Sequence, residues 1–345
     1  MITFYSLLHE RHAPEYEFYR GERVACFESS LRVEYVHREL IARGHGICTP
    51  SSDSREVLTQ IHTGQYLNFL ETAWSRWLAF DPANASSQPF PSVWPVRTLR
   101  SDLEPDNFIA QLGLYSMDNG TPMVEGTWAA AKAGADCAAS AAHLVLSGER
   151  SAFCATRPPG HHAGVDFMGG YCFLNNAAVA AQTFINSGVS RVAILDVDYH
   201  HGNGTQSIFY DRSDVLFISI HGDPRTEYPF YLGHSDEIGQ AAGEGFNLNI
   251  PLSAGTSSDI WFEALEQACS RITHHRAEAL VVSLGLDTFV NDPISRFALS
   301  TPDFSKLGAR LERIGLPTVF ILEGGYATRE LGINAVNVLD AFDTA

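Results

Sequence analysis

The stretch R-V-A-I-L-D-V-D-Y-H-H-G-N-G-T-Q, Arg191 to Gln206, decides the fold. Its apolar residues 192–195 are enough for a strand and too few for a helix. An apolar run without polar alternation is typical of a strand buried on both faces of a parallel α/β sheet. Asp196, Asp198, His200 and His201 follow at the strand's carboxyl end, where such sheets bind ligands. Because these side chains are costly to bury unpaired, we first interpret the cluster as a cation site.

The composition is that of a globular enzyme. The 345 residues are 45% hydrophobic, and the formal net charge of −17 argues against nucleic-acid binding. That charge would attract cationic ligands, although it also serves solubility. No apolar run reaches the roughly 18 residues of a membrane helix, and the N-terminus lacks a basic leader, so we expect a cytoplasmic protein. The six cysteines form no CxxC pair, so we expect neither a disulfide framework nor a zinc finger.

The chain alternates apolar bursts with helical stretches, which predicts βαβ units and a central, mostly parallel sheet. Residues 80–125 differ, because six of the sixteen prolines fall between Pro82 and Pro122. We expect a single domain over 1–345 in which 80–125 is an ordered functional loop. Strands are expected at 1–7, 151–154, 192–195, 215–220, 279–284 and 318–322; helices are expected at 28–44, 57–78, 126–146, 176–187, 260–275 and 304–314.

Four of these strands end in polar clusters, which would meet at one edge of a parallel sheet. Asp198, His200 and Asp287 would make an open three-ligand metal site, the catalytic kind. His161 and His162 suit general acid and base catalysis. Tyr326, after two glycines, suits a donor to a developing oxyanion. Each feature alone has a simpler interpretation as a turn or cap, but together they indicate amide or ester hydrolysis.

Five motifs in order then resemble the arginase–deacetylase superfamily, specifically its zinc-dependent deacetylases. They are R-P-P-G-H-H-A, G-G-Y-C-F-L-N-N, L-D-V-D-Y-H-H-G-N-G-T, S-L-G-L-D-T-F and L-E-G-G-Y. I-H-T-G-Q-Y-L-N-F-L-E-T-A-W-S-R-W, H-G-D-P and L-D-T-F-x-x-D-P-I-S are most similar to bacterial acetylpolyamine amidohydrolases, relatives of class II histone deacetylases. The resemblance implies the arginase–deacetylase fold, with about eight strands and helices on both faces.

The resemblance also implies a role for each matching residue. One catalytic zinc (or Fe²⁺) would be bound by the three ligands, with His162 the principal base and His161 its electrostatic partner. Tyr326 would bind the carbonyl oxygen. A two-manganese arginase site fits less well, because Gly202 and Phe289 stand where further carboxylates are needed. The resemblance further implies that Asp196 orients His161 and that Asn203 contacts His162. It implies a potassium ion near Asp196, Asp198, His200, Ser219 and Ile220. It also implies that Gly170, Tyr171 and Tyr228 form a substrate tunnel.

The function that this resemblance implies is hydrolysis of N-acetyl amides of polyamines or short diamines, releasing acetate and amine. The expected substrates are acetylputrescine, acetylcadaverine and acetylspermidine. The alternatives are a protein acetyl-lysine deacetylase and a non-catalytic acyl- or metal-binding member. Residues 80–125 would form a homodimer contact and narrow an acidic entrance, where Glu104, Asp106, Asp118 and Glu125 are candidates to bind the distal ammonium.

Overall fold

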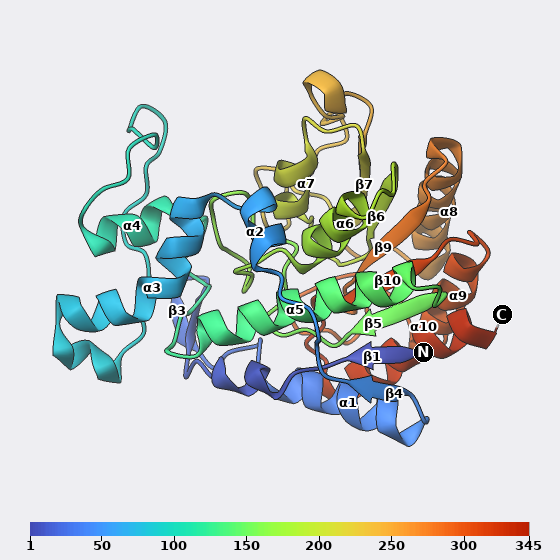
Figure 1. Ribbon diagram of the computed structural model, residues 1–345, viewed down its shortest axis with the longest axis horizontal. Helices are drawn as coiled ribbons and strands as arrows, with labels where there is room; N and C mark the ends of the chain where they lie inside the picture. Colours follow the sequence, from blue (N-terminus) through green and yellow to red (C-terminus); the bar gives the residue numbers. More distant parts are fainter. Residues whose placement is uncertain (345) are drawn as a thin grey trace.

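An eight-stranded, entirely parallel sheet forms the centre of the computed structural model, which describes residues 1–344 (Figure 1). Its order is β4-β1-β5-β10-β9-β6-β7-β8. The strand count and the parallel arrangement confirm the predicted fold class. The strands are β1 Ile2–Phe4, β4 Gly46–Cys48, β5 Ser151–Cys154, β6 Val192–Asp196, β7 Val215–Gly222, β8 Asn247–Leu252, β9 Ala279–Leu284 and β10 Thr318–Leu322.

Helices cover both faces of this sheet, and the strands explain why. Along β6, Val192 and Ile194 join one hydrophobic core, whereas Ala193 and Leu195 join the other. Successive side chains of a strand point to opposite faces, so an uninterrupted apolar strand needs cover on both. One core contains α2 Arg55–Ile61, α3 Gly64–Phe80, α4 Phe108–Leu114, α5 Thr127–Leu146, α6 Asn176–Asn186 and α7 Asn203–Phe209; the other contains α1 Leu31–Ala42, α8 Ser258–His275, α9 Thr301–Glu312 and α10 Thr328–Thr344.

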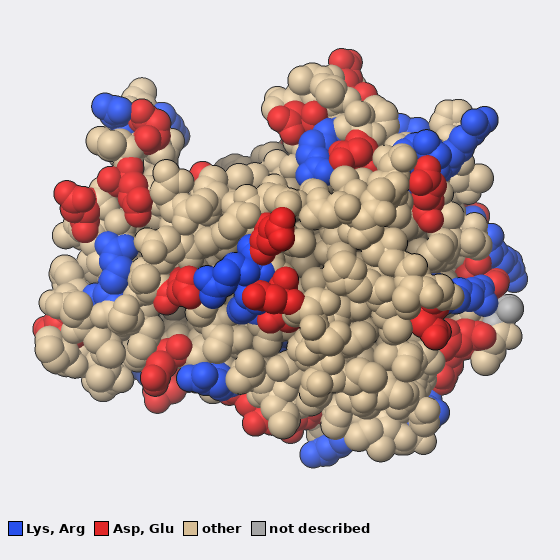
Figure 2. Space-filling model, in the orientation of Figure 1, with Lys and Arg blue, Asp and Glu red and all other residues tan. Residues whose placement is uncertain are grey.

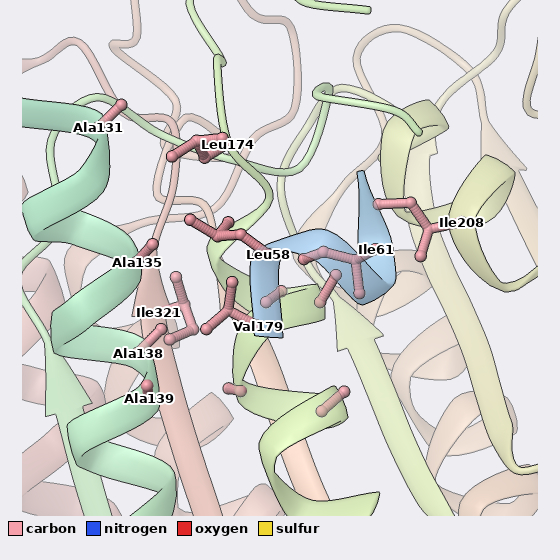
Figure 3. Packing of buried hydrophobic residues seen from close by; sticks show 14 of the residues in the cluster. Leu58, Ile61, Ala131, Ala135, Ala138, Ala139, Leu174, Val179, Ile208 and Ile321 are labelled. Carbon is pink, nitrogen blue, oxygen red and sulfur yellow. The ribbon is translucent and has the colours of Figure 1, made fainter. Parts of the chain in front are cut away.

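The alanines of α5 let this helix lie close to the sheet. Figure 3 shows Ala135 and Ala138 facing Ile321 of β10 and Val179 of α6. Small side chains permit close approach of backbones, and dense packing of such layers leaves few voids. The predicted buried helix at 126–146 is confirmed.

The single helix predicted over 57–78 is wrong, because the chain breaks between α2 and α3. His62 is extended, and its Nδ1 donates to the carbonyl oxygen of Gly164 (2.7 Å). The backbone N–H of Thr63 bonds to Val165 O (2.9 Å), and the Thr63 hydroxyl caps α3 by accepting from Tyr66 N. The N–H of His62 still bonds to Leu58 O, but the N–H of Thr63 bonds to this distant segment, which ends the helix at Ile61.

Residues 80–125 form a mostly irregular segment that projects from the body at α4 (Figure 1). It contains the short helix η2 Pro82–Ser86 and α4, which the sequence analysis did not predict. Within the segment, Trp94 donates its Nε1–H to Ser116 O (2.9 Å), and the N–H of Met117 joins the segment to the body by donating to Met168 O (2.9 Å). The remaining short elements are η1 Leu7–Arg11, η3 Ala241–Gly243 and the hairpin of β2 Glu17–Tyr19 with β3 Glu22–Val24. Among residues 1–344, none of the helices has the length and apolarity needed to cross a bilayer.

Candidate active site

The site lies where four parallel strands end. β5, β10, β9 and β6 are consecutive neighbours in the sheet. Their parallel register brings the turns after Cys154, Asp196, Leu284 and Leu322 to one edge. The predicted convergence of the four polar clusters is confirmed, because parallel strands all present their carboxyl ends on the same side.

Asp198, His200 and Asp287 form a group of metal-ligand type, with one ligand atom from each within 4.8 Å of the others. His200 Nδ1 lies 2.9 Å from Asp287 Oδ2 and 3.3 Å from Asp198 Oδ1. The other carboxylate oxygens accept backbone hydrogen bonds, Asp198 Oδ2 from Gly324 N (2.8 Å) and Asp287 Oδ1 from Tyr199 N (2.8 Å). Each carboxylate is thus fixed in orientation with one oxygen facing the shared position.

The electrostatics of this group favour a cation. Burial would lower the pKa of His200, but the two adjacent carboxylates outweigh it and raise the pKa to about 10. Burial and the charge of Asp198 raise the pKa of Asp287 to about 8. Two fully buried carboxylates and an imidazole are the hard and borderline ligands that divalent metals take. The donor set therefore fits one metal ion.

The two tandem histidines have different partners, which separates their roles. His161 Nδ1 donates to Asp196 Oδ2 (3.0 Å); burial opposes its charge, but Asp198 and Asp196 raise its pKa to about 10. His162 Nδ1 donates to the amide oxygen of Asn203 (2.6 Å). Burial, reinforced by the positive charges of His161 and His200, holds the pKa of His162 well below its usual range. His162 is thus neutral, and its unprotonated Nε2 can accept a proton.

Tyr326 completes the base of the site. Its backbone N–H donates to Asp292 Oδ2 (2.7 Å), and the Arg32 guanidinium lies 4.8 Å from its ring centroid. Arg32 also donates to the carbonyl oxygens of Glu323 and Gly325, so helix α1 holds the turn that carries Tyr326. Burial raises the pKa of the Tyr326 phenol well above its usual value, which keeps the hydroxyl protonated as a donor.

A cavity of about 590 Å³ leads to these residues. Gly170, Tyr171 and Tyr228, the residues predicted for a substrate tunnel, line it together with His162, His200, Asn203 and Tyr326. Of the four loop carboxylates proposed for the entrance, Asp118 alone is among its lining residues. Arg20, Arg296 and Glu227 also line the cavity, so two guanidinium groups and two carboxylates are among its lining residues. The acidic entrance stays a prediction.

Other predicted residues lie deeper. Asp196 and Ser219 are register partners on β6 and β7, both fully buried, and Ile220 follows on β7. His201, part of the cluster first interpreted as a cation site, turns away to Gln206 and Asn249. Cys172 approaches His161 and Glu323, but burial raises the pKa of its thiol well above its usual value, consistent with packing.

Sequence reasoning missed three residues that support the site. Asp292 holds the backbone of Tyr326, and its position in D-P-I-S was the available signal. Glu28 pairs with Arg32 (3.0 Å) and Arg157 (2.8 Å) beneath the site. Glu17 accepts a hydrogen bond from the Tyr171 hydroxyl (2.8 Å). For Glu17 and Glu28 the sequence carried no signal, because lone glutamates are ordinarily surface residues.

Comparisons with known proteins agree with this geometry. Residues 20–342 match the family described as the histone deacetylase domain. Acetylpolyamine amidohydrolases 1 and 2 of Pseudomonas aeruginosa are 50% and 49% identical, covering 100% and 99% of this chain and 99% of each relative. The crystal structure of acetylpolyamine aminohydrolase from Burkholderia pseudomallei superposes with a TM-score of 0.94 at 37% identity, covering 100% of this chain and 99% of that one.

The fold, the strand-end site and the match over nearly the whole chain define the class: the chain belongs to the histone deacetylase domain family, with the arginase–deacetylase fold. Within that family its full-length relatives are amidohydrolases. The protein is accordingly a hydrolase that acts on amides.

Proposed function

We propose that the protein is a zinc-dependent deacetylase of acetylated polyamines and short diamines such as acetylputrescine, acetylcadaverine and acetylspermidine. The observation that carries the proposal is the arrangement at the base of the cavity. There His162, with a free Nε2, and the protonated Tyr326 lie beside the three metal-type ligands. The full-length relatives are named acetylpolyamine amidohydrolases, which favours acetylpolyamines over other amides.

Asp198, His200 and Asp287 would hold the zinc ion. The chemistry that bound zinc supplies is polarisation of the acetyl carbonyl and a lowered pKa of water. Fe²⁺ is the other metal that this proposal admits, because imidazole and carboxylate donors suit both ions.

The chain's own residues would perform the proton transfers. His162 Nε2 takes a proton from water as the water oxygen adds to the acetyl carbon, and the Tyr326 hydroxyl donates a hydrogen bond to the developing oxyanion. His162 returns the proton to the amide nitrogen as the C–N bond breaks, giving acetate and the free amine. The positive charge of His161, stabilised by Asp196, keeps His162 from binding its proton too tightly.

The test compares kcat/KM of the zinc-loaded protein on N-acetylputrescine, N-acetylcadaverine and acetylspermidine with that on an acetyl-lysine peptide. We expect a preference of about tenfold or more for the small amines, which corresponds to about 1.4 kcal/mol in the transition state. Preference for the peptide would establish the protein acetyl-lysine alternative instead. Absence of turnover on every substrate would leave the non-catalytic alternative.

We also propose a homodimer in which residues 80–125 contact a second copy. The support is a run of exposed aliphatic side chains on the projecting segment: Val93, Val96, Leu99 and Leu103 are each more than half exposed. In Figure 2 the same projection also carries charges of both signs, which suits a polar rim around an apolar contact. Val96→Asp with Leu103→Asp should yield a monomer in analytical ultracentrifugation, whereas unchanged mass would refute the contact.

A structural potassium ion beside Asp196, Asp198, His200, Ser219 and Ile220 completes the proposal, supported by the full burial of Asp196 next to Ser219 in the sheet. We place the protein in the cytoplasm, because all six cysteines are free thiols and reducing compartments keep thiols unpaired. The proposed partners are the cationic substrate and a second copy, with no nucleic acid or membrane.

A further inference from the structure

The carboxylate of Asp118 joins two walls of the cavity. Its Oδ2 accepts hydrogen bonds from the Gly170 N–H and from the Tyr228 hydroxyl, both at 2.7 Å. Its Oδ1 accepts from Gly120 N (3.0 Å) and from the Thr121 hydroxyl (2.9 Å). A carboxylate offers about four acceptor positions, so protein donors already use the acceptor capacity of Asp118. A substrate ammonium would have to displace one of these donors.

Thr121 extends the connection to a third lining residue. The Tyr171 N–H donates to Thr121 Oγ1 (3.1 Å), while the Thr121 hydroxyl donates to Asp118. Tyr171 has a φ of 67°, which is costly for a residue with a side chain and persists only where the surroundings enforce it. The hydroxyl of Tyr171 is held separately by Glu17 (2.8 Å). Both ends of Tyr171 are therefore fixed by hydrogen bonds.

These walls touch the proposed catalytic groups. The Tyr228 ring centroid lies 5.1 Å from that of His162 and 6.1 Å from that of His200. The backbone at Gly170 packs so closely on His162 that a Cβ there would lie 2.2 Å from Cδ2 of the imidazole. A shift of Asp118 would consequently move both the tunnel and the contact surface of the proposed base.

We propose that Asp118 is a positioning residue: it fixes the distance between the side chains of Tyr171 and Tyr228, and it fixes the position of the His162 imidazole. In this proposal Asp118 is not the group that binds the distal ammonium of the substrate. This inference rests on the proposed deacetylase function. It differs from the expectation for Asp118 as an entrance carboxylate, because that expectation needs an oxygen free to meet a cation.

The test uses two substrates of matched length, cationic N-acetylputrescine and neutral N-pentylacetamide, with the zinc-loaded full chain. Asp118→Asn keeps the shape but places an NH₂ group against donors that need an acceptor. We expect kcat/KM to fall by about ten- to a hundredfold on both substrates, in the range of a lost hydrogen bond to a charged group. Asp259→Asn, at an exposed position in the first turn of α8, is the control and should change neither substrate by more than about twofold.

A double-mutant cycle provides the second measurement. Tyr228→Phe removes only the phenol donor, and in that background Asp118→Asn should cost less than it does in the wild type. Thr121→Val removes one link while leaving the carboxylate, and it should lower turnover of both substrates too. A loss confined to N-acetylputrescine, additive with Tyr228→Phe, would show that Asp118 binds the ammonium and would overturn the inference. Equal rates for variant and wild type would also overturn it, whereas a wild type inactive on both amides would overturn the proposed function itself.

Discussion

Replacing Tyr326 by Phe isolates the contribution of one hydroxyl group. Among the described residues 1–344, no protein group accepts a hydrogen bond from that hydroxyl, so its removal should change the free energy of unfolding by no more than about 0.5 kcal/mol. The ring would stay in place, because Asp292 holds the backbone N–H at 2.7 Å and the Arg32 guanidinium lies 4.8 Å from the ring centroid.

The catalytic effect of the same change should be large. A buried donor aimed at a developing oxyanion is worth about a hundred- to a thousandfold in kcat, or about 2.7–4 kcal/mol. Because burial raises the pKa of Tyr326, the wild-type hydroxyl stays a donor throughout the neutral range. The assay measures kcat on N-acetylputrescine together with bound zinc and the melting temperature. Tyr35→Phe, at a half-buried position on α1, is the matched control.

A kcat reduced less than about threefold, with zinc still bound, would refute the oxyanion role of Tyr326. Loss of zinc in the variant would refute the reasoning differently, because it would show that the hydroxyl supports the metal site. Only a large fall in kcat at unchanged zinc content and stability agrees with the geometry.

Three further changes test other parts of the site. His200→Ala should abolish stoichiometric zinc binding measured by mass spectrometry, because a site of three protein ligands loses one. Gly170→Ala should lower kcat/KM at least about tenfold, since its Cβ would clash with His162 at a backbone φ of 52°. Burial raises the pKa of Glu17 to about 7, so the folded state binds the proton of this carboxyl group more tightly than the unfolded chain does, and protonation stabilises the folded state. The stabilisation is present below the unfolded pKa of 4.5 and is lost as pH rises through about 7. Glu17→Gln should therefore gain melting temperature relative to the wild type between pH 5 and pH 8.

Each of these has its own control. His274→Ala, at the end of α8, should leave zinc content unchanged, and full occupancy in His200→Ala would contradict the assigned ligand set. Gly64→Ala, at the start of α3, has open space around it and no positive φ, and it should spare activity. For Glu17, a difference in melting temperature that is constant with pH would show that its carboxyl does not titrate in this range.

The sequence was most informative where a strand was apolar throughout. The strands predicted at 151–154, 192–195, 279–284 and 318–322 agree with β5, β6, β9 and β10 to within one residue. Their parallel arrangement then placed the polar residues after each strand at one edge. This worked because burial on both faces and the period of a strand are local properties.

The parts that could not be predicted depend on contacts distant in sequence. The break between α2 and α3 arises from hydrogen bonds between Thr63 and Val165, about a hundred positions apart, which no helical pattern reveals. Asp118 is one of four loop carboxylates that the sequence offers as candidates for the substrate ammonium, yet Oδ2 of Asp118 has partners 52 and 110 positions away, at Gly170 and Tyr228. A carboxylate in a polar loop looks the same in sequence whether its acceptors are free or occupied.

The order of the strands has a consequence for biosynthesis. β10, the last strand along the chain, lies between β5 and β9 near the middle of the sheet. Until residues 318–322 leave the ribosome, β1, β4 and β5 have no contact through the sheet with β6 to β9, and two apolar strand edges stay unpaired. Such edges are templates for aggregation, and their closure by a strand so distant in sequence is slow. We expect nascent chains that stop before Thr318 to need a chaperone, and activity to appear only after synthesis has passed Tyr326.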